Sequence, residues 1–148
     1  MRTRVLTVLF ACLVWTSVGC GKKEGGAAAG PGEPAHVDGT PHTDQVVNAW
    51  KGAGFPAEGF AAIDPTAYRA GYCSQGRVGG IDALICEYRD DDSIDRARKL
   101  IQDEWGKEGV HTGVALRSKR TLVAVADRGR SDPSGKTINK LLDTFKKL

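Results

Sequence analysis

The sequence predicts an α+β domain: an antiparallel sheet of about four strands, built from two hairpins, with its helices on one face. Two stretches rich in β-forming residues, 69–89 and 113–126, each contain a central turn and therefore predict hairpins. Apolar residues at helical spacing follow each hairpin. A further amphipathic stretch precedes the first hairpin, so we expect an extra N-terminal helix before a tandem pair of strand–strand–helix blocks.

The N-terminal helix is expected to begin at Thr43 or Asp44, because both side chains can cap a helix. Gly52 and Gly54 follow the apolar positions and can end the helix. Beyond it, an extended segment is expected at residues 59–63. The apolar positions of the helix are Val46, Val47, Ala49 and Trp50.

The first hairpin is expected to turn at the glycine pair 79–80, because glycine accepts the positive φ that such a turn requires. Counted outward from the turn, Val78 pairs with Ile81. The fifth step beyond that pair joins Cys73 to Cys86. Hydrogen-bonded and non-hydrogen-bonded pairs alternate, so the cysteines fall at a non-hydrogen-bonded pair, where Cα atoms lie ~4.5 Å apart. A disulfide tolerates that separation, and we predict one between Cys73 and Cys86.

The second helix is expected after the acidic residues 90–92, with Asp92 or Ser93 as its cap. Negative charge is favoured there because it interacts with the positive end of the helix dipole. A calcium-binding loop is the alternative interpretation, but the run lacks the Asp-x-Asp-x-Asp-Gly pattern and a distal glutamate. The apolar stripe of this helix consists of Ile94, Ala97, Leu100, Ile101 and Trp105.

The second hairpin is expected to turn at residues 118–119. This turn places Val114 opposite Val123, and it places Leu116 opposite Thr121. Side chains two residues apart share a face of a strand, so one face of the hairpin is apolar. The expected core face consists of Val114, Leu116, Val123 and Val125.

A last helix is expected at residues 134–148, with Asp132 as its cap and Pro133 as its first helical residue. The two strand–strand–helix blocks lie about 40 residues apart, which suggests an internal duplication. The apolar side of the last helix consists of Ile138, Leu141, Leu142, Phe145 and Leu148.

Residues 1–19 have the organisation of a secretory signal peptide. Arg2 and Arg4 give a short positive start. An apolar stretch follows at residues 5–18, and small residues precede Cys20. That stretch is shorter than the ~20 residues of a membrane-spanning helix. The alternative, a buried N-terminal helix, conflicts with the poorly packing segment that follows.

The sequence Ser17-Val18-Gly19-Cys20 resembles a lipobox, at which bacterial lipoproteins are cleaved and lipidated. The resemblance implies that Gly19 precedes the cut and that Cys20 carries acyl chains such as palmitate, although Ser17 stands where leucine is usual. One acyl chain binds a membrane only marginally, and the resemblance implies several, which form a stable anchor. Gly21, rather than aspartate, follows the anchor, which by the sorting pattern of such lipoproteins implies the outer membrane, facing the periplasm or the exterior.

Residues 20–42 are expected to form the lipid anchor and a flexible tether, because this Gly-, Ala- and Pro-rich segment cannot bury enough surface to offset its ordering entropy. Residues 43–148 form the expected globular domain. With Cys12 removed in the signal peptide and Cys20 lipidated, the domain keeps two cysteines in an oxidising compartment, which favours their disulfide. The mature region resembles the small lipoproteins of bacterial envelopes, a resemblance that implies no particular activity.

Residues 134–137, Ser-Gly-Lys-Thr, follow a strand and begin a helix, as in a phosphate-binding loop. Arg130 stands where the pattern requires glycine, however, and Pro133 removes one of the backbone N–H groups that would bind phosphate. We therefore expect no nucleotide. The net charge of +3 is too small and too dispersed to indicate nucleic acid.

The sequence favours a non-catalytic domain that binds an envelope protein or has a structural role, anchored to membrane lipid through Cys20. No catalytic Ser/His/Asp or Cys/His set is apparent, and Asp82 and Glu87 are expected on opposite faces of one strand, so we expect neither enzymatic activity nor a cofactor. The alternatives are an envelope enzyme without a recognisable motif and a metal-handling lipoprotein. A flexible linker seldom preorganises ligands, which disfavours the second. Its ligands would be His36, Asp38, His42 and Asp44.

Overall fold

The computed structural model describes residues 35–105 and 113–148. It confirms the α+β class and the expected order of elements, with a sheet of five strands because the segment around residues 59–63 joins as an edge strand. None of the helices in these residues is long and apolar enough to span a membrane. The elements are α1 (Thr43–Gly52), β1 (Ala57–Ile63), η1 (Pro65–Tyr68), β2 (Tyr72–Val78), β3 (Ile81–Glu87), α2 (Asp91–Trp105), β4 (Gly113–Ser118), β5 (Thr121–Ala126) and α3 (Lys136–Phe145).

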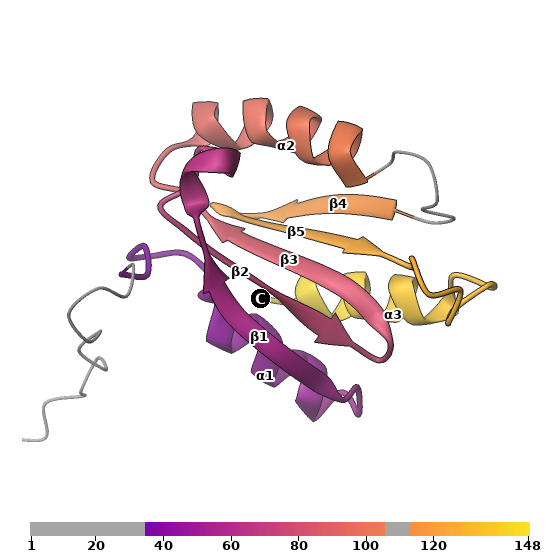
Figure 1. Cartoon of the computed structure of the whole chain (residues 1–148). Helices are drawn as coiled ribbons and strands as arrows, with labels where there is room; N and C mark the ends of the chain where they lie inside the picture. Colours follow the sequence, from indigo (N-terminus) through magenta and orange to yellow (C-terminus); the bar gives the residue numbers. More distant parts are fainter. Residues whose placement is uncertain (1–34, 106–112) are drawn as a thin grey trace, which may run out of the picture.

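The five strands form one antiparallel sheet in the order β1-β2-β3-β5-β4, with β3 at its centre (Figure 1). The first hairpin has the expected register, in which Val78 pairs with Ile81. In the second hairpin Val114 pairs with Val125, and Leu116 pairs with Val123, so the expected register is wrong by two residues. The turn lies at residues 119–120 instead of 118–119. A shift of two residues keeps each side chain on its face of the sheet, because strands have a period of two.

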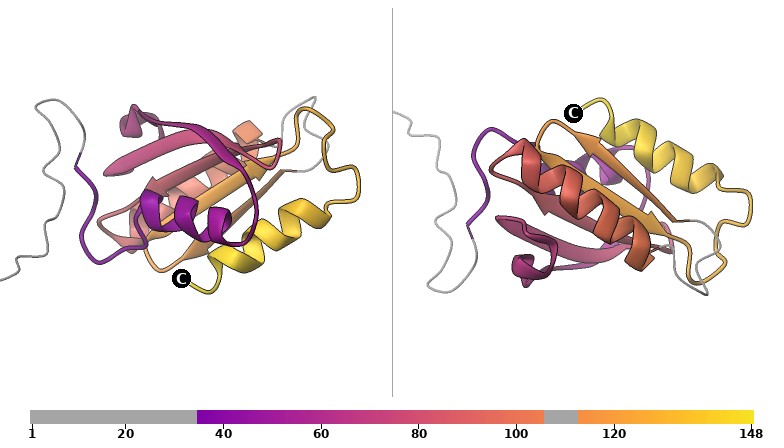
Figure 2. Two further views of the ribbon diagram at one scale, coloured as in Figure 1. Left: turned by 90° about the horizontal axis from the view of Figure 1, so that it is seen from below. Right: turned by 90° about the horizontal axis from the view of Figure 1, so that it is seen from above.

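The helices cover both faces of the sheet, so the prediction of helices on one face is wrong (Figures 1 and 2). Helices α1 and α3 pack on one face against Ile85 and Val123, and α2 packs on the other against Leu84 and Leu122. Every residue of β5 is buried. Strands covered on both faces carry continuous apolar runs rather than alternating ones, and β3 and β5 have such runs.

The opposite placement of α2 and α3 also argues against the expected internal duplication. A twofold axis that exchanged the β2–β3 and β4–β5 hairpins in this strand order would run perpendicular to the sheet, and it would keep both helices on the same face. Helix α3 instead packs beside α1, where the Trp50 indole Nε1 donates a hydrogen bond to the Leu141 carbonyl oxygen at 3.0 Å. Trp50 and Leu141 are both fully buried.

Two residues that were predicted to lie in the core are exposed. Val114 is 40% exposed because β4 is the edge strand farthest from α1, and Leu100 is 38% exposed. The buried stripe of α2 runs through Ile94, Ala97, Ile101 and Trp105. Leu100 is adjacent to Ile101 in the sequence, and one residue corresponds to about 100° of rotation around a helix, so Leu100 points away from the sheet.

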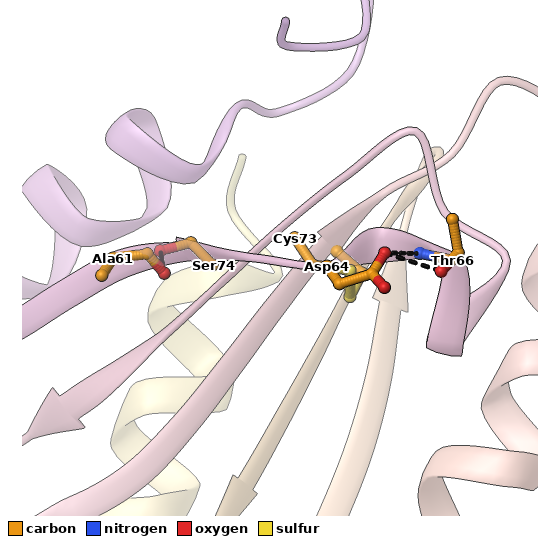
Figure 3. Close-up of a disulfide and its surroundings, with 6 residues drawn as sticks. Ala61, Asp64, Thr66, Cys73 and Ser74 are labelled. Carbon is orange, nitrogen blue, oxygen red and sulfur yellow. Dashed lines mark hydrogen bonds between the residues drawn. A yellow bond between two sulfur atoms is a disulfide. The ribbon is translucent and has the colours of Figure 1, made fainter. Parts of the chain in front are cut away.

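The predicted disulfide is present between Cys73 on β2 and Cys86 on β3, whose Cα atoms lie 4.2 Å apart (Figure 3). Both cysteines are fully buried beneath α2. The neighbouring edge strand is fastened by Ser74, whose hydroxyl donates a hydrogen bond to the Ala61 carbonyl oxygen at 3.0 Å (Figure 3). The bridge thus joins the central strand to the half of the sheet that α2 does not contact extensively.

Removal of the disulfide should lower stability without changing the fold. A Cys73→Ala/Cys86→Ala variant is expected to lose about 3 kcal/mol of unfolding free energy, because a closed loop of this length restricts the unfolded chain. Urea denaturation of both proteins, with and without dithiothreitol, measures the difference. Dithiothreitol should destabilise the wild type and leave the variant unchanged; a wild-type midpoint that is insensitive to the reductant would contradict the bridge.

Candidate functional site

A fully buried carboxylate lies where the N-terminal segment meets the sheet. Glu87 is the last residue of the central strand β3, flanked by Tyr72 on β2 and Thr121 on β5. Its side chain is inaccessible to solvent. A buried carboxylate is strongly destabilising unless hydrogen-bond donors surround it, so the partners of Glu87 decide whether this part of the fold is stable.

Three donors from the N-terminal segment satisfy Glu87. Its Oε1 accepts hydrogen bonds from His36 Nδ1 at 2.7 Å and from the Thr43 backbone N–H at 2.7 Å. Its Oε2 accepts one from the Val37 backbone N–H at 2.9 Å. We call this arrangement of Glu87 with His36, Val37 and Thr43 the Glu87 clasp. It fixes the first residue of α1 and the residues before it to the centre of the sheet.

The His36 ring contacts two other rings. The His42 ring stacks on it at 5.0 Å between centroids with an interplanar angle of 8°, and Tyr72 lies 4.2 Å away with a tilt of 39°. Because a carboxylate only accepts, His36 Nδ1 carries the hydrogen in its bond to Glu87. The other nitrogen, Nε2, lies 3.8 Å from the Asp44 carboxylate, and the side chain is 31% exposed.

The segment immediately before α1 packs against the folded domain. Val37, Thr40 and Pro41 are buried. The Thr121 hydroxyl donates a hydrogen bond to the Pro41 carbonyl oxygen at 2.7 Å, which attaches the segment to β5. A side chain at Gly71 would come within 2.6 Å of Val37 Cγ2, so glycine is required there for Val37 to pack.

The structure brings together part of the expected metal-ligand set. His36, His42 and Asp44 are neighbours. His42 Nε2, however, lies 3.1 Å from the Val37 carbonyl oxygen and must donate to it, so this nitrogen is not a free ligand. The Asp38 backbone carbonyl accepts a hydrogen bond from Arg120. Within residues 35–105 and 113–148, no three His, Cys, Asp or Glu side chains are grouped so that they could hold a metal ion.

The acidic run at residues 90–92 caps α2, which confirms its interpretation as a helix N-terminus. Asp90 performs the capping rather than Asp92 or Ser93: its carboxylate accepts hydrogen bonds from the Ser93 backbone N–H at 2.8 Å and from the Ser93 hydroxyl at 3.0 Å. The backbone bond, followed by the hydroxyl bond, lowers the pKa of Asp90. Helix α2 begins at Asp91, directly after this cap.

In the loop before α3, carboxylates of the loop accept hydrogen bonds from the backbone N–H groups. In a phosphate-binding loop, the bound phosphate would accept them. Buried Asp127 accepts from the backbone N–H groups of Ser131 and Asp132, both at 2.8 Å. The Asp132 carboxylate accepts a hydrogen bond from the Ile138 backbone N–H at 2.9 Å. The N-cap position is occupied by Gly135 and α3 begins at Lys136, so the expected cap at Asp132 and the expected first helical residue at Pro133 are wrong. Burial acts to raise the pKa of Asp132, but hydrogen bonds from the Ile138 backbone N–H and the Ser134 hydroxyl oppose it, and the net effect lowers the pKa.

Comparison of the chain with protein-family models, curated proteins and solved structures gives no match. Of the expected site residues, Cys73 and Cys86 form the disulfide, whereas Cys20 lies outside the described residues. Sequence reasoning missed the central role of Glu87. The sequence indicates this role by placing a glutamate at the otherwise apolar end of a strand, because a carboxylate buried there needs hydrogen-bond donors.

Substitution of Glu87 should weaken the attachment of the N-terminal segment. In Glu87→Gln the amide NH₂ would point at one of the three donors. Because both groups donate, that buried hydrogen bond is lost and the two groups repel each other. We expect a loss of about 3 kcal/mol in unfolding free energy, measured by urea denaturation.

The matched control is Glu58→Gln, which removes the same charge from an exposed position on β1 and should change stability by at most about 0.5 kcal/mol. Limited proteolysis should cut the Glu87→Gln protein near residues 36–43 faster than it cuts the wild type. Equal stability of Glu87→Gln and wild type would show that the clasp contributes nothing.

Proposed function

We propose that the chain is a bacterial envelope lipoprotein: cleaved before Cys20, lipidated on that residue and carrying a small non-catalytic domain that binds an envelope protein or serves a structural role. One observation carries the proposal. A lipobox-like sequence ending at Cys20 is followed by a Gly-, Ala- and Pro-rich segment that leads directly into the Glu87 clasp of a disulfide-bonded domain. The absence of aspartate after Cys20 favours the outer membrane.

The position of the clasp supports a role in anchoring. A tethered domain experiences its load at the residue where the tether becomes structured. Here that load passes through the Val37 and Thr43 backbone amides into Glu87, on the central strand, rather than into an edge strand. Central strands are the last elements to open in local unfolding, so the attachment suits a domain held by its N-terminus.

The disulfide and the tether length support the same function. A buried Cys73–Cys86 bridge suits an oxidising compartment outside the cytosol. A Gly-rich chain as long as the segment between Cys20 and His36 would hold the domain roughly 20 Å from its anchor. Anchoring in this way raises the effective concentration of a binding module near the membrane without any additional contact.

Loss of the lipid-bearing residue tests the proposal. Cys20→Ala should remain unprocessed and unlipidated, whereas mass spectrometry of the wild type should find a mature N-terminus at an acylated Cys20. Fractionation with Triton X-114 should place the wild type in the detergent phase. An unmodified, full-length wild-type chain in the aqueous cytosolic fraction would refute the proposal.

Metal handling is a second candidate, favoured by the environment of His36. A histidine that ligates a metal through one nitrogen commonly donates its other N–H to a carboxylate, which is the relation of His36 to Glu87. Asp44 lies beside the free nitrogen, at 3.8 Å, and could contribute a second ligand. Two protein ligands would bind a metal only weakly, so we rank this function below that of a binding module.

Metal titration separates the two candidates. If His36 binds metal, Zn²⁺ or Cu²⁺ at roughly a hundred times the Kd should stabilise the protein by about 2.7 kcal/mol. His36→Ala should abolish the shift, while Asp143→Asn, which removes an exposed carboxylate on α3, should retain it. A melting temperature that does not respond to excess metal would end this candidate.

A further inference from the structure

A second surface lies at the end of the sheet opposite the Glu87 clasp. Asp82 and Glu87 stand near the two ends of β3, about 16 Å apart for strand geometry. At the Asp82 end, the β2–β3 turn lies against the loop that follows β5 (Figure 1). A side chain at Gly80 would come within 3.1 Å of Ser131, which shows how closely the two segments approach.

Two arginines at this end share a single carboxylate. Arg77 Nε lies 3.4 Å from Asp82 Oδ1, and Arg128 Nη1 lies 3.5 Å from Asp82 Oδ2. Both distances exceed the ~2.7–2.9 Å of a strong charge-assisted hydrogen bond. Their side chains are 60% and 41% exposed, against 24% for Asp82. We call Arg77, Asp82 and Arg128 the arginine surface. It contains two accessible guanidinium groups and only one carboxylate, to which neither guanidinium makes a short hydrogen bond.

Both guanidinium groups are oriented in advance. Arg128 lies over the Trp105 ring, 4.5 Å from its centroid, and Trp105 is the buried last residue of α2. Arg77 Nη2 donates a hydrogen bond to the Gly80 carbonyl oxygen at 3.0 Å. A planar guanidinium that is already stacked or hydrogen-bonded loses less conformational entropy when it binds a carboxylate. Arginine and tryptophan are also the residues that most often dominate binding energy at interfaces.

We infer that the arginine surface docks an acidic protein partner through the partner's carboxylate groups, which rests on the proposed function of a binding module. A carboxylate is the group that the surface already holds, in Asp82. The N-terminal segment joins the domain at the other end of β3, so Arg77 and Arg128 lie at the end of the strand remote from the attachment that leads to Cys20. A protein presenting aspartate and glutamate is therefore a better match than the lipid head groups beneath the anchor.

The test measures binding of the full chain, purified in detergent micelles, to immobilised poly-L-glutamate at fixed ionic strength. Arg77→Gln/Arg128→Gln should weaken binding roughly tenfold, since charge pairs at an interface contribute on that scale. The matched control is Arg98→Gln/Lys99→Gln, which removes two exposed positive charges from α2 and should change binding less than twofold. Arg77→Gln alone, which leaves the Trp105 contact intact, should give an intermediate loss.

Equal weakening of binding by the two double variants would overturn the inference, because it would show that binding depends only on the net charge of the protein. The inference would also fail if Arg77→Gln/Arg128→Gln kept its affinity for poly-L-glutamate but lost affinity for phosphatidylglycerol vesicles, since the surface would then bind lipid. Thermal melts of each variant confirm that the protein is folded. The comparison on poly-L-glutamate does not depend on lipidation at Cys20, so its failure leaves the anchoring proposal standing.

Discussion

The structure depends on the burial of one carboxylate at the end of its central strand. Glu87 has no access to solvent, and all three of its donors come from the segment that precedes the first β-strand. The sheet therefore cannot pack its core stably unless His36, Val37 and Thr43 are in place. In turn, those residues cannot be released without leaving a carboxylate buried and unpaired, which is costly. The domain and its N-terminal attachment are for this reason one cooperative unit.

Most local features of the fold were predicted correctly from the sequence, whereas the placement of the helices on the two faces of the sheet was not. The Gly79–Gly80 turn fixes the register of the first hairpin, and with it the Cys73–Cys86 pair, because the turn and the pairs are close in the chain. In the second hairpin the turn contains Lys119, which adopts a φ of 51° despite its side chain, so no glycine marked the true position. The runs of apolar residues in β3 and β5 did contain the signal for two-sided burial.

The candidate site was predicted only in part, because its contacts join residues about 50 positions apart in the sequence. From the sequence, His36, Asp38, His42 and Asp44 were considered together only as a disfavoured set of metal ligands in a linker that was expected to be flexible. The linker is ordered from His36 onward because Glu87 and Thr121 supply hydrogen bonds from distant strands. Composition cannot reveal such partners, because a Gly- and Pro-rich segment has the same composition whether or not it packs against a sheet.

The two ends of β3 thus differ: the Glu87 end holds the N-terminal segment and the Asp82 end carries the arginine surface. Hydrogen exchange tests whether the clasp joins the N-terminal segment to the core. The backbone N–H of Thr43, in the first turn of α1, would ordinarily lack a partner and exchange quickly. We expect the Thr43 and Val37 amides to exchange as slowly as those of β3, at the rate of global unfolding. Rapid exchange of both amides while β3 remains protected would contradict it.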